Sequence, residues 1–486
     1  MIRLRYGRVP LPRILQNVRE RLVLVLIAVL PFHALLVTVL TKFFAGAGHA
    51  PLPILALWKE GVLALILALC CVEMMREDRR WKMEDGRQLL ATSHFPFPTF
   101  DILDACTLVL MFIAVLPLIT TFSHPTPTWL LGFKYDFLLL GIFPCVRRVP
   151  WSDTFRTRVI RILLVDAVLV GIFAVVSSVV PQVFFTFLGY SDLHSLYLPD
   201  GPIAAFQQIE SIALRRVQST FSGPNQLALW LLLPYAAYLA SKPEFPHKVG
   251  ATFLVLIGLT FSRAALLAFF CMTVMNFFLV YSRKEAWIRV SILSAFLALP
   301  LGLAIAKSPD LLLRATSTRG HWDRPLEAIQ TIIQHPLGLG LGSAGPASNR
   351  VSDACVFLEA ESDASWARDR GELCVFVGGT QMQPLNRTCR CPLLPENWYL
   401  QIGVELGVLG FLLYLTLTIM IFRALLSIVR SGVHPSPLLH AAFLAFFGIS
   451  IAALFLHAWE DSALAYSLWM LVGMALPAHR QNLSTA

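Results

Sequence analysis

Residues 1–30 read MIRLRYGRVPLPRILQNVRERLVLVLIAVL, a basic segment followed directly by an apolar one. This order is typical of a secretory signal, but no small-residue cleavage site follows the apolar part, and further apolar runs come after it. The sequence therefore predicts that this segment is retained as a first membrane helix. Its basic flank also predicts the orientation of the helices that follow.

The composition of the whole chain is that of a membrane protein. Of its 486 residues, 56% are hydrophobic and only 14% are charged, and the mean hydropathy is +0.67. A soluble protein of this length needs more polar surface to cover its cores. The net charge of +9 could indicate nucleic-acid binding. The basic residues, however, lie between apolar runs, so membrane topology explains them and no nucleic-acid partner is expected.

Many apolar runs approach the ~20 residues that cross a bilayer. We therefore expect an all-α polytopic membrane protein with about twelve transmembrane helices and one large outer loop between spans nine and ten. The expected spans are 22–43, 54–74, 102–122, 129–146, 162–186, 225–241, 249–261, 264–281, 290–306, 399–422, 438–457 and 462–478.

Charge asymmetry between the loops supports this topology. The short loops 44–53, 123–128 and 458–461 contain no Lys or Arg, whereas the loops on the other side are rich in both. The positive-inside rule then puts both termini in the cytoplasm. Three regions result: an N-terminal bundle of about nine spans (1–306, with a smaller outer loop at 187–224), a large outer loop (307–398) and a three-span segment (399–486).

Cysteine usage fits an exported loop. Cys355, Cys374, Cys389 and Cys391 all lie in the large loop, and an even number there predicts two disulfides in an oxidising compartment. Cys389 and Cys391 are too close to pair comfortably, so each is expected to bond to Cys355 or Cys374. Four free thiols or a zinc site is the alternative. The other five cysteines lie in or beside spans and are expected to be inert.

Four polar clusters stand at expected outer ends of the spans. The first is RRVQSTFSGPN, in which Arg215 and Arg216 precede a helix start at Gly223, Pro224 and Asn225. Proline is tolerated at an early helical position. A solvated loop beside an ordinary helix start is the simpler interpretation of this cluster.

The second cluster is a single cation. Arg263, in LTFSRAALLAFF, lies between two apolar runs with no acidic neighbour in sequence. A cation at such a position is costly and usually functional, which favours a place on a substrate path. An arginine whose charge reaches the lipid headgroups is the alternative.

The third cluster follows an amphipathic segment at 322–334 that is expected to be helical. It reads HPLGLGLG, with His335, Gly338 and Gly340, and Arg319 precedes it. Alternating glycines allow close approach of the backbone, which could line a phosphate or sugar pocket.

The fourth cluster is PENWYLQIGVELGVLG at 395–410. Glu396 and Asn397 stand just before a span that then carries Gly407 and Gly410. As a structural feature, Glu396 is an anion that favours the helix dipole. As a functional feature, it is a carboxylate placed to act as a general base.

Further acidic groups lie near this cluster. Glu405 is about two turns deeper in the span, and His457, Glu460 and Asp461 stand at the outer end of span eleven. These three could border the same cavity, but a capped, solvated turn is the simpler interpretation.

Taken in order, the four clusters resemble motifs of the O-antigen ligase and polymerase superfamily, the WaaL- and Wzy-type integral membrane glycosyltransferases. That family has an arginine ahead of a Gly-x-Phe-x-x-Pro-Asn-like span start. Arg216 and STFSGPN are similar, with Ser219 where glycine is usual. It has a Ser-Arg pair between consecutive spans, matched by Ser262 and Arg263.

The resemblance continues through the large loop. HPLGLGLG matches a His-Pro-Leu-x-Gly-x-Gly segment, with Arg319 upstream at a fitting distance. Ligases then carry His-Asn, nine residues, and Gly-x-x-Gly. Asn397, Gly407 and Gly410 match this pattern, but Glu396 replaces the histidine, as it often does in polymerase-like members.

The resemblance implies an inner-membrane glycosyltransferase of lipopolysaccharide or surface polysaccharide assembly in bacteria. It would move a glycan from an undecaprenyl diphosphate carrier to an acceptor hydroxyl on the periplasmic side, without a metal or other cofactor. The acceptor would be lipid A-core in a ligase or a lipid-linked glycan in a polymerase, and a ligase acting on surface proteins is a third option. Membrane lipids surround the protein.

The resemblance also implies roles for individual residues. Arg216, Arg263 and Arg319 would clamp the diphosphate, because arginine forks suit phosphate oxygens. Glu396, oriented by Asn397, would take the proton of the acceptor hydroxyl. The remaining candidates for binding diphosphate or sugar are Arg215 and His335.

The rival class is a flippase or carrier for a lipid-linked or anionic sugar, which would use the same arginines without a base. Such a carrier tends to show related halves and charges near the midplane. We find no internal repeat, and the polar groups gather at one face.

Overall fold

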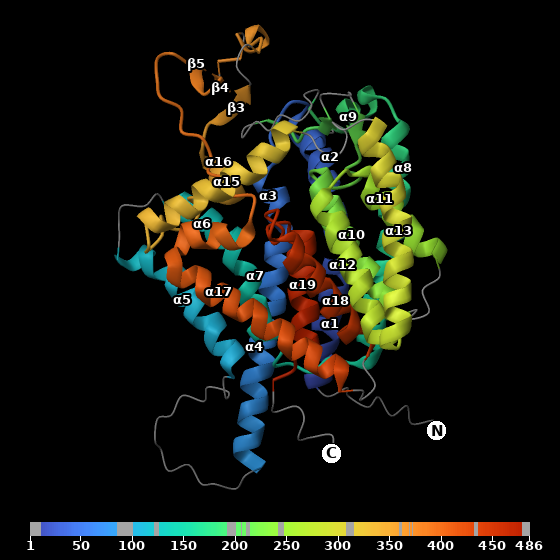
Figure 1. The fold of residues 1–486 in the computed structure, drawn as a ribbon. Coiled ribbons are helices and arrows are strands. Elements are labelled where there is room, and N and C mark those ends of the chain that lie inside the picture. The colour runs from blue at the N-terminus through green and yellow to red at the C-terminus, as the bar shows by residue number, and fades with distance from the viewer. Residues whose placement is uncertain are drawn as a thin grey trace, which may run out of the picture.

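The computed structural model describes residues 11–84, 101–120, 126–191, 201–205, 207–209, 214–241, 247–307, 315–358, 362–368, 370–371, 373–431 and 436–478. Over these residues the protein is mostly helical (Figure 1).

The first half of the chain forms long apolar helices, some broken at proline. A single 3-10 turn at Leu30–Phe32, which contains Pro31, separates the first two helices, and Pro181 separates α8 from α9. The helices are α1 (Leu11–Val29), α2 (His33–Ala45), α3 (Pro53–Ala56), α4 (Trp58–Glu84), α5 (Ile102–Thr120), α6 (Thr126–Gly132), a π-helical segment (Phe133–Phe137), α7 (Leu138–Val146), α8 (Asp153–Val179) and α9 (Gln182–Leu188).

The second half is also mainly helical, with two segments between its helices that contain short strands. Its helices are α10 (Pro224–Ser241), α11 (His247–Leu259), α12 (Arg263–Val280), α13 (Arg283–Lys307), α15 (Ala315–Gln334), α16 (Gly345–Val351), α17 (Trp398–Arg430), α18 (Pro437–Ala452) and α19 (Ser462–Ala475). The strands are β1 (Gln207–Ile209), β2 (Leu214–Arg216), β3 (Ala354–Leu358), β4 (Leu373–Val377) and β5 (Thr380–Gln383).

Five helical stretches are long and apolar enough to cross a membrane, judged by length and composition, among the described residues. Several further apolar helices are shorter. The expectation of an α-helical membrane protein agrees with this architecture, whereas the count of twelve spans stays a prediction. The five stretches are Arg13–Ala45, Pro127–Val146, Asp153–Val179, Arg263–Val280 and Trp398–Arg430.

The centre of the bundle is packed by α10, α12, α18 and α19, with α7 against α19 (Figure 1). Trp230, Trp459 and Trp469 are fully buried there, and Trp459 and Trp469 contact each other with ring centroids 5.4 Å apart. These large side chains fill the space between helices without adding charge.

The two ends of the described chain both form hydrogen bonds with the short segment 147–150. Arg19 of α1 donates to Pro150 O (2.7 Å), and Ala478 N, after α19, donates to Arg147 O (2.9 Å). Arg147 is buried and also pairs with Asp101 through a bond of 2.8 Å. The start of α1 and the end of α19 therefore lie at one end of the bundle. We call the other end, which carries β1–β5, α15 and α16, the loop end.

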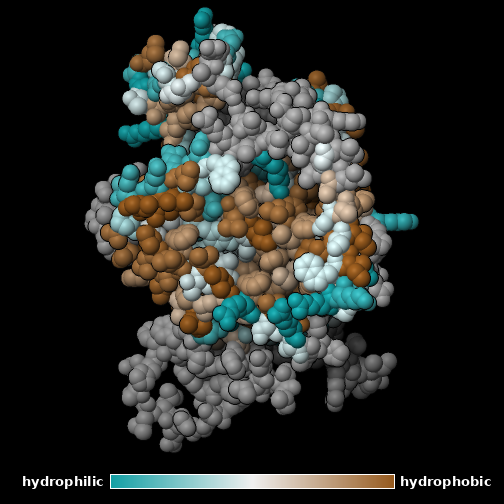
Figure 2. All heavy atoms as spheres, viewed as in Figure 1, coloured by the Kyte–Doolittle hydropathy of each residue, from teal (hydrophilic) through white to brown (hydrophobic). Residues whose placement is uncertain are grey.

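The segment between α16 and α17 contains a small three-stranded sheet, which adds a β unit to the expected helical membrane architecture. Strand β3 pairs in parallel with β4, and β4 pairs antiparallel with β5. Disulfides Cys355–Cys391 and Cys374–Cys389 close this unit, as the cysteine spacing predicts. Figure 2 shows apolar side chains in a band across the middle of the molecule, with hydrophilic ones above and below.

Candidate functional site

The glycine-rich segment after α15 docks into a break in α17. Gly407 has φ 72° and ψ −169°, so the helix is interrupted there. Three backbone hydrogen bonds cross between the two segments and satisfy groups that the break leaves without helical partners. They run from Leu339 N to Val404 O (2.8 Å), from Gly340 N to Glu405 O (3.0 Å) and from Val408 N to Pro336 O (3.0 Å).

Glycine is required at this crossing because the two backbones touch. A Cβ on Gly407 would lie 2.0 Å from Pro336 O, and one on Gly338 would lie 2.3 Å from Glu405 O. The third and fourth sequence clusters therefore meet. The close approach that the glycines allow is to the protein's own backbone, and a role of Gly338 and Gly340 in lining a ligand pocket stays a prediction.

The start of α17 is anchored by four consecutive residues, 396–399, each of which donates a hydrogen bond to the segment 450–457. The bonds run from Glu396 N to His457 Nε2 (3.2 Å), from Asn397 Nδ2 to Leu454 O (2.9 Å), from Trp398 N to Ala453 O (2.9 Å) and from Tyr399 Oη to Ser450 O (2.9 Å). Glu396 is therefore carried by a rigid part of the fold.

Glu396 itself has φ 51°, which is uncommon for a residue with a side chain. Its carboxylate pairs with Arg324 of α15, and the two side chains are 21% and 42% exposed. Asn397 is the N-cap of α17, and its Oδ1 accepts from Leu400 N (3.0 Å). Asn397 thus fixes the backbone next to Glu396, while Arg324 contacts the carboxylate.

A buried polar network lies behind Glu396. His457 Nδ1 contacts Gln401 Oε1 (2.6 Å). The amide nitrogen of Gln401 contacts Asp136 Oδ1 and Glu460 Oε1, both at 2.9 Å. Burial lowers the pKa of His457 to about 4 and raises the pKa of Glu460 well above its ordinary value. The ion pair at Glu396 is thereby joined to the interior of the bundle.

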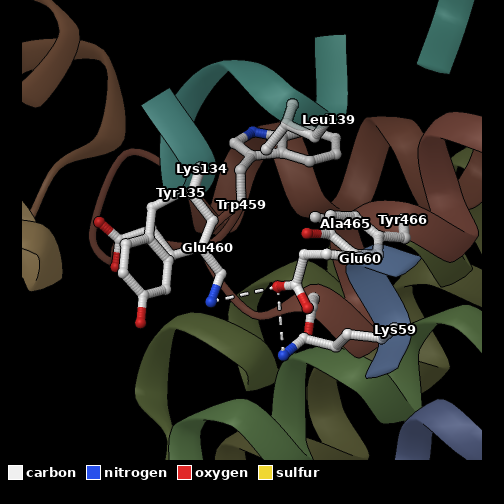
Figure 3. Close-up of a pocket in the computed structure, with 10 residues that line it drawn as sticks. Lys59, Glu60, Lys134, Tyr135, Leu139, Trp459, Glu460, Ala465 and Tyr466 are labelled. Atoms are coloured by element: carbon white, nitrogen blue, oxygen red, sulfur yellow. Dashed lines mark ion pairs between the residues drawn. The ribbon is translucent and has the colours of Figure 1, made fainter. Parts of the chain in front are cut away.

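A small cavity of about 40 Å³ adjoins this network at Glu460 (Figure 3). Lys59 and Lys134 both point at the carboxylate of Glu60, with Nζ–Oε1 distances of 3.4 and 3.1 Å. Trp459 is another of the residues that line this space. Asp461, next along the chain, caps α19 through Ala463 N (3.0 Å), as expected of a capped turn. His457 and Glu460 instead belong to the site.

The first two sequence clusters are also joined. Arg216 is 9% exposed, and its guanidinium donates to Thr260 O (2.9 Å), Gln207 Oε1 (3.0 Å) and Asn225 Oδ1 (2.8 Å). Thr260 belongs to the turn that leads into Arg263. Arg216 therefore ties β2 and β1 to the start of α10 and to this turn.

Arg215 lies on the same strand and donates to backbone carbonyls at the end of α8, Ser177 O (3.1 Å) and Val180 O (2.7 Å). Arg263 is the first residue of α12 and is partly buried. The side chain of Arg319, on α15, lies outside the described residues. His335 is exposed directly after α15.

Left-handed backbone marks three of the four clusters. Among the described residues, the non-glycine positions with positive φ are Ser219 (51°), Phe261 (53°) and Glu396 (51°). Each stands in a turn just before a helix: Ser219 before α10, Phe261 before α12 and Glu396 before α17. Strain of this kind costs of order 1–3 kcal/mol and gathers at functional sites. A positive φ at Ser219 is a conformation that glycine adopts more readily than serine.

The sequence alone does not identify several residues of this network. Arg324 lies in an amphipathic helix whose polar face offers several charges, and Gln401 lies inside an apolar span. Asp136 is the one acidic residue between Thr126 and Val146, and that isolation is the signal that could have found it.

The fold and the site define a helical membrane protein with a polar site where a loop docks into a broken helix at the loop end. Compared with known proteins, the chain matches no family model and no curated protein.

Proposed function

We propose that the protein is a membrane glycosyltransferase that moves a glycan from an undecaprenyl diphosphate carrier to an acceptor hydroxyl. The observation that carries the proposal is the placement of Glu396. Its backbone is held in a left-handed conformation at the start of a broken helix, and its carboxylate is partly exposed beside Arg324. A base and a cation side by side suit a reaction that removes a proton and releases an anion.

The reaction would proceed by direct displacement. Glu396 takes the proton of the acceptor hydroxyl as its oxygen bonds to the anomeric carbon of the donor sugar. The bond between that carbon and the diphosphate oxygen breaks, and undecaprenyl diphosphate leaves with the electron pair. Arg324, together with Arg263 and Arg319, would stabilise the negative charge on the leaving group. The proposed reaction needs no metal.

The exposed side chains of helix α15 support the proposal that the substrate lies at the membrane surface. Trp322, Leu326 and Ile333 on this helix are 71%, 55% and 72% exposed, whereas Ala328 is buried against α17. A helix with one packed face and one exposed apolar face suits the boundary between lipid and water. Arg324 and Glu396 would then stand at headgroup depth, where a lipid diphosphate lies.

The proposed location follows from the loop charges. We place about twelve spans in the inner membrane of a bacterium, both termini in the cytoplasm and the loop end in the periplasm. The two disulfides of the outer unit support an oxidising compartment at that end.

Within this class the favoured activity is that of an O-antigen ligase acting on lipid A-core. A polymerase that extends a lipid-linked glycan is the second candidate, favoured by the Glu-Asn pair at 396–397. A carrier is less well supported, because the site gathers at one end of the bundle.

Transfer in proteoliposomes tests the proposal. Undecaprenyl diphosphate-linked glycan is offered with lipid A-core in the presence of a chelator, with wild type beside Glu396→Gln. We expect product on lipid A-core and a loss of about 10²- to 10⁴-fold in the variant. Longer lipid-linked chains instead would identify a polymerase. Equal product from both proteins would refute the role of Glu396, and no product with any acceptor would favour transport.

A further inference from the structure

We propose that His457, as a neutral imidazole with its proton on Nδ1, is the positioning residue that holds Glu396 in its left-handed conformation. The inference rests on the proposed function for its catalytic meaning, but the arrangement itself is independent of that function. It is carried by a chain of hydrogen bonds whose direction can be assigned from one end to the other.

The inner end of the chain fixes the orientation of Gln401. This side chain is fully buried, and one of its terminal atoms contacts Asp136 Oδ1 and Glu460 Oε1. Its amide NH₂ group faces these two oxygens and offers a donor to each. The carbonyl oxygen of Gln401 therefore faces His457, and Nδ1 of His457 must carry the proton that it accepts.

The hydrogen bond between Glu396 and His457, at the other end of this series of bonds, leads to the same protonation state of His457. The backbone N–H of Glu396 can only donate, so His457 Nε2 must accept from it. A neutral imidazole with Nδ1–H meets both requirements. A protonated imidazole would point an N–H at the N–H of Glu396, and the bond would be lost.

The bond matters because Glu396 needs an external constraint. A φ of 51° is disfavoured for a residue with a Cβ and persists only where its surroundings impose it. Asn397 and Trp398 fix the residues after Glu396, and Glu396 N is held by His457. Without this bond the carboxylate would lose its fixed direction.

The surroundings of His457 keep it neutral. Burial is the main cause of its lowered pKa of about 4, and the positive charge of Arg324 acts in the same direction, while the carboxylate of Glu396 opposes both. The other group that faces the imidazole is the uncharged amide of Gln401. The unfolded chain takes up this proton near pH 6.5, whereas the folded protein takes it up near pH 4. Stability should therefore fall as the pH falls from 6.5 to 4.

The test compares two variants of His457. In His457→Gln the amide can accept from Glu396 N and donate to Gln401, and it does not titrate. In His457→Leu both bonds are lost. Hydrogen exchange of the peptide that contains Glu396 reports the bond without any substrate, and transfer in proteoliposomes reports its effect on activity. His440→Gln, a histidine at the opposite end of α18, is the matched control for both readouts.

We expect faster exchange at Glu396 and roughly 100-fold slower transfer in His457→Leu, since a misplaced catalytic group costs about that factor. His457→Gln should keep both properties near wild type, and its melting temperature should fall less than that of wild type between pH 6.5 and 4. Wild-type exchange and transfer in His457→Leu would overturn the proposal. So would a His457→Gln variant that keeps the amide protected but transfers as slowly as His457→Leu, because the imidazole would then act chemically.

The two proposals can fail separately. If exchange responds as expected while Glu396→Gln transfers normally, the positioning of the backbone stands and the role of Glu396 as a base is wrong. If Glu396→Gln abolishes transfer while His457→Leu changes neither readout, the base stands and the positioning role is wrong.

Discussion

The carboxyl groups of Asp136 and Glu405 contact each other in the interior of the bundle. Asp136 Oδ1 accepts from Gln401, and Glu405 Oε1 accepts from Gly342 N (2.9 Å). Among the residues that the structure describes, no N–H or O–H group donates to the second, buried oxygen of either carboxyl group. Two acceptors that face each other need one hydrogen between them, so the pair works as a unit that joins the π-helical segment to α17.

This arrangement predicts different effects for two substitutions of Glu405. Glu405→Gln offers an N–H to Asp136 and keeps an oxygen for Gly342 N, so its free energy of unfolding should stay close to that of wild type. Glu405→Leu leaves the second oxygen of Asp136 and the loop amide of Gly342 without partners and should lose about 3 kcal/mol. Thermal unfolding in detergent, followed by tryptophan fluorescence, measures both. Equal melting temperatures for the two variants would contradict the shared-hydrogen arrangement.

The break in α17 predicts a large effect of one methyl group. In Gly407→Ala the new Cβ meets Pro336 O and the residue must keep φ 72°, so the glycine-rich segment can no longer dock as it does. We expect a loss of at least 2 kcal/mol in the free energy of unfolding. Gly258→Ala in α11 is the control. No atom lies within 4 Å of its added Cβ, and it should be neutral or stabilise by up to about 1 kcal/mol. A Gly407→Ala variant as stable as the control would show that the docking is dispensable.

The region around Glu396 shows what a sequence can and cannot predict. The apolar runs and the loop charges predict the helices, because burial and topology depend on composition and period. The disulfides followed from the spacing of Cys389 and Cys391. The glycine pattern predicts close approach of the backbone but does not identify the partner, because the contact joins Pro336 and Gly407 across 71 residues of sequence.

The buried polar network around Gln401 could not be predicted from the sequence for a related reason. Gln401 and Asp136 are 265 residues apart and meet only because the π-helical segment packs beside α17. The bond from Glu396 N to His457 involves a backbone amide, which no pattern of side chains reveals. The family resemblance points to Arg319, whereas Arg324 is identified only by its ion pair with Glu396.

The sheet of β3, β4 and β5 should depend on its disulfides. Cys355–Cys391 closes 36 residues, and such a link contributes about 3–4 kcal/mol to the unit that it closes. Replacing both cysteines by serine should open the unit to proteases while the melting temperature of the helical bundle changes little. Limited proteolysis with mass spectrometry locates the cuts, and Cys71→Ser, at an exposed free thiol, is the control. Protection of residues 354–391 in the double variant would mean that packing and the remaining Cys374–Cys389 disulfide hold the sheet without this link.

The other end of the bundle depends on Arg147. Its side chain is 4% exposed, it bridges Asp101 and Asp104, and it also donates to Leu476 O (3.0 Å). Arg147→Leu leaves Asp101 without its cation and Asp104 with Arg148 alone, and should lose about 3 kcal/mol. Arg158→Leu, at an exposed position on α8, should change the free energy of unfolding by less than about 0.5 kcal/mol. Similar unfolding of the two variants would contradict a structural role for the Arg147 cluster.

Substitutions of Arg216 and Arg324 should have different effects: the first on the stability of the fold, the second on transfer. Arg216 is buried with three bonds inside the fold, so Arg216→Gln should lower the free energy of unfolding by about 2 kcal/mol. Arg324 is 42% exposed, and breaking a partly exposed pair costs at most about 1 kcal/mol. Because the Arg324 guanidinium lies beside the proposed base, Arg324→Gln should slow transfer roughly 10- to 100-fold in protein of normal stability, and Arg324→Lys should recover part of the rate. Parallel measurements of melting temperature and transfer on the three variants show which arginine stabilises the fold and which one acts in transfer. Full transfer by Arg324→Gln would remove this arginine from the site, whereas normal stability of Arg216→Gln would return Arg216 to the group of arginines available for the diphosphate.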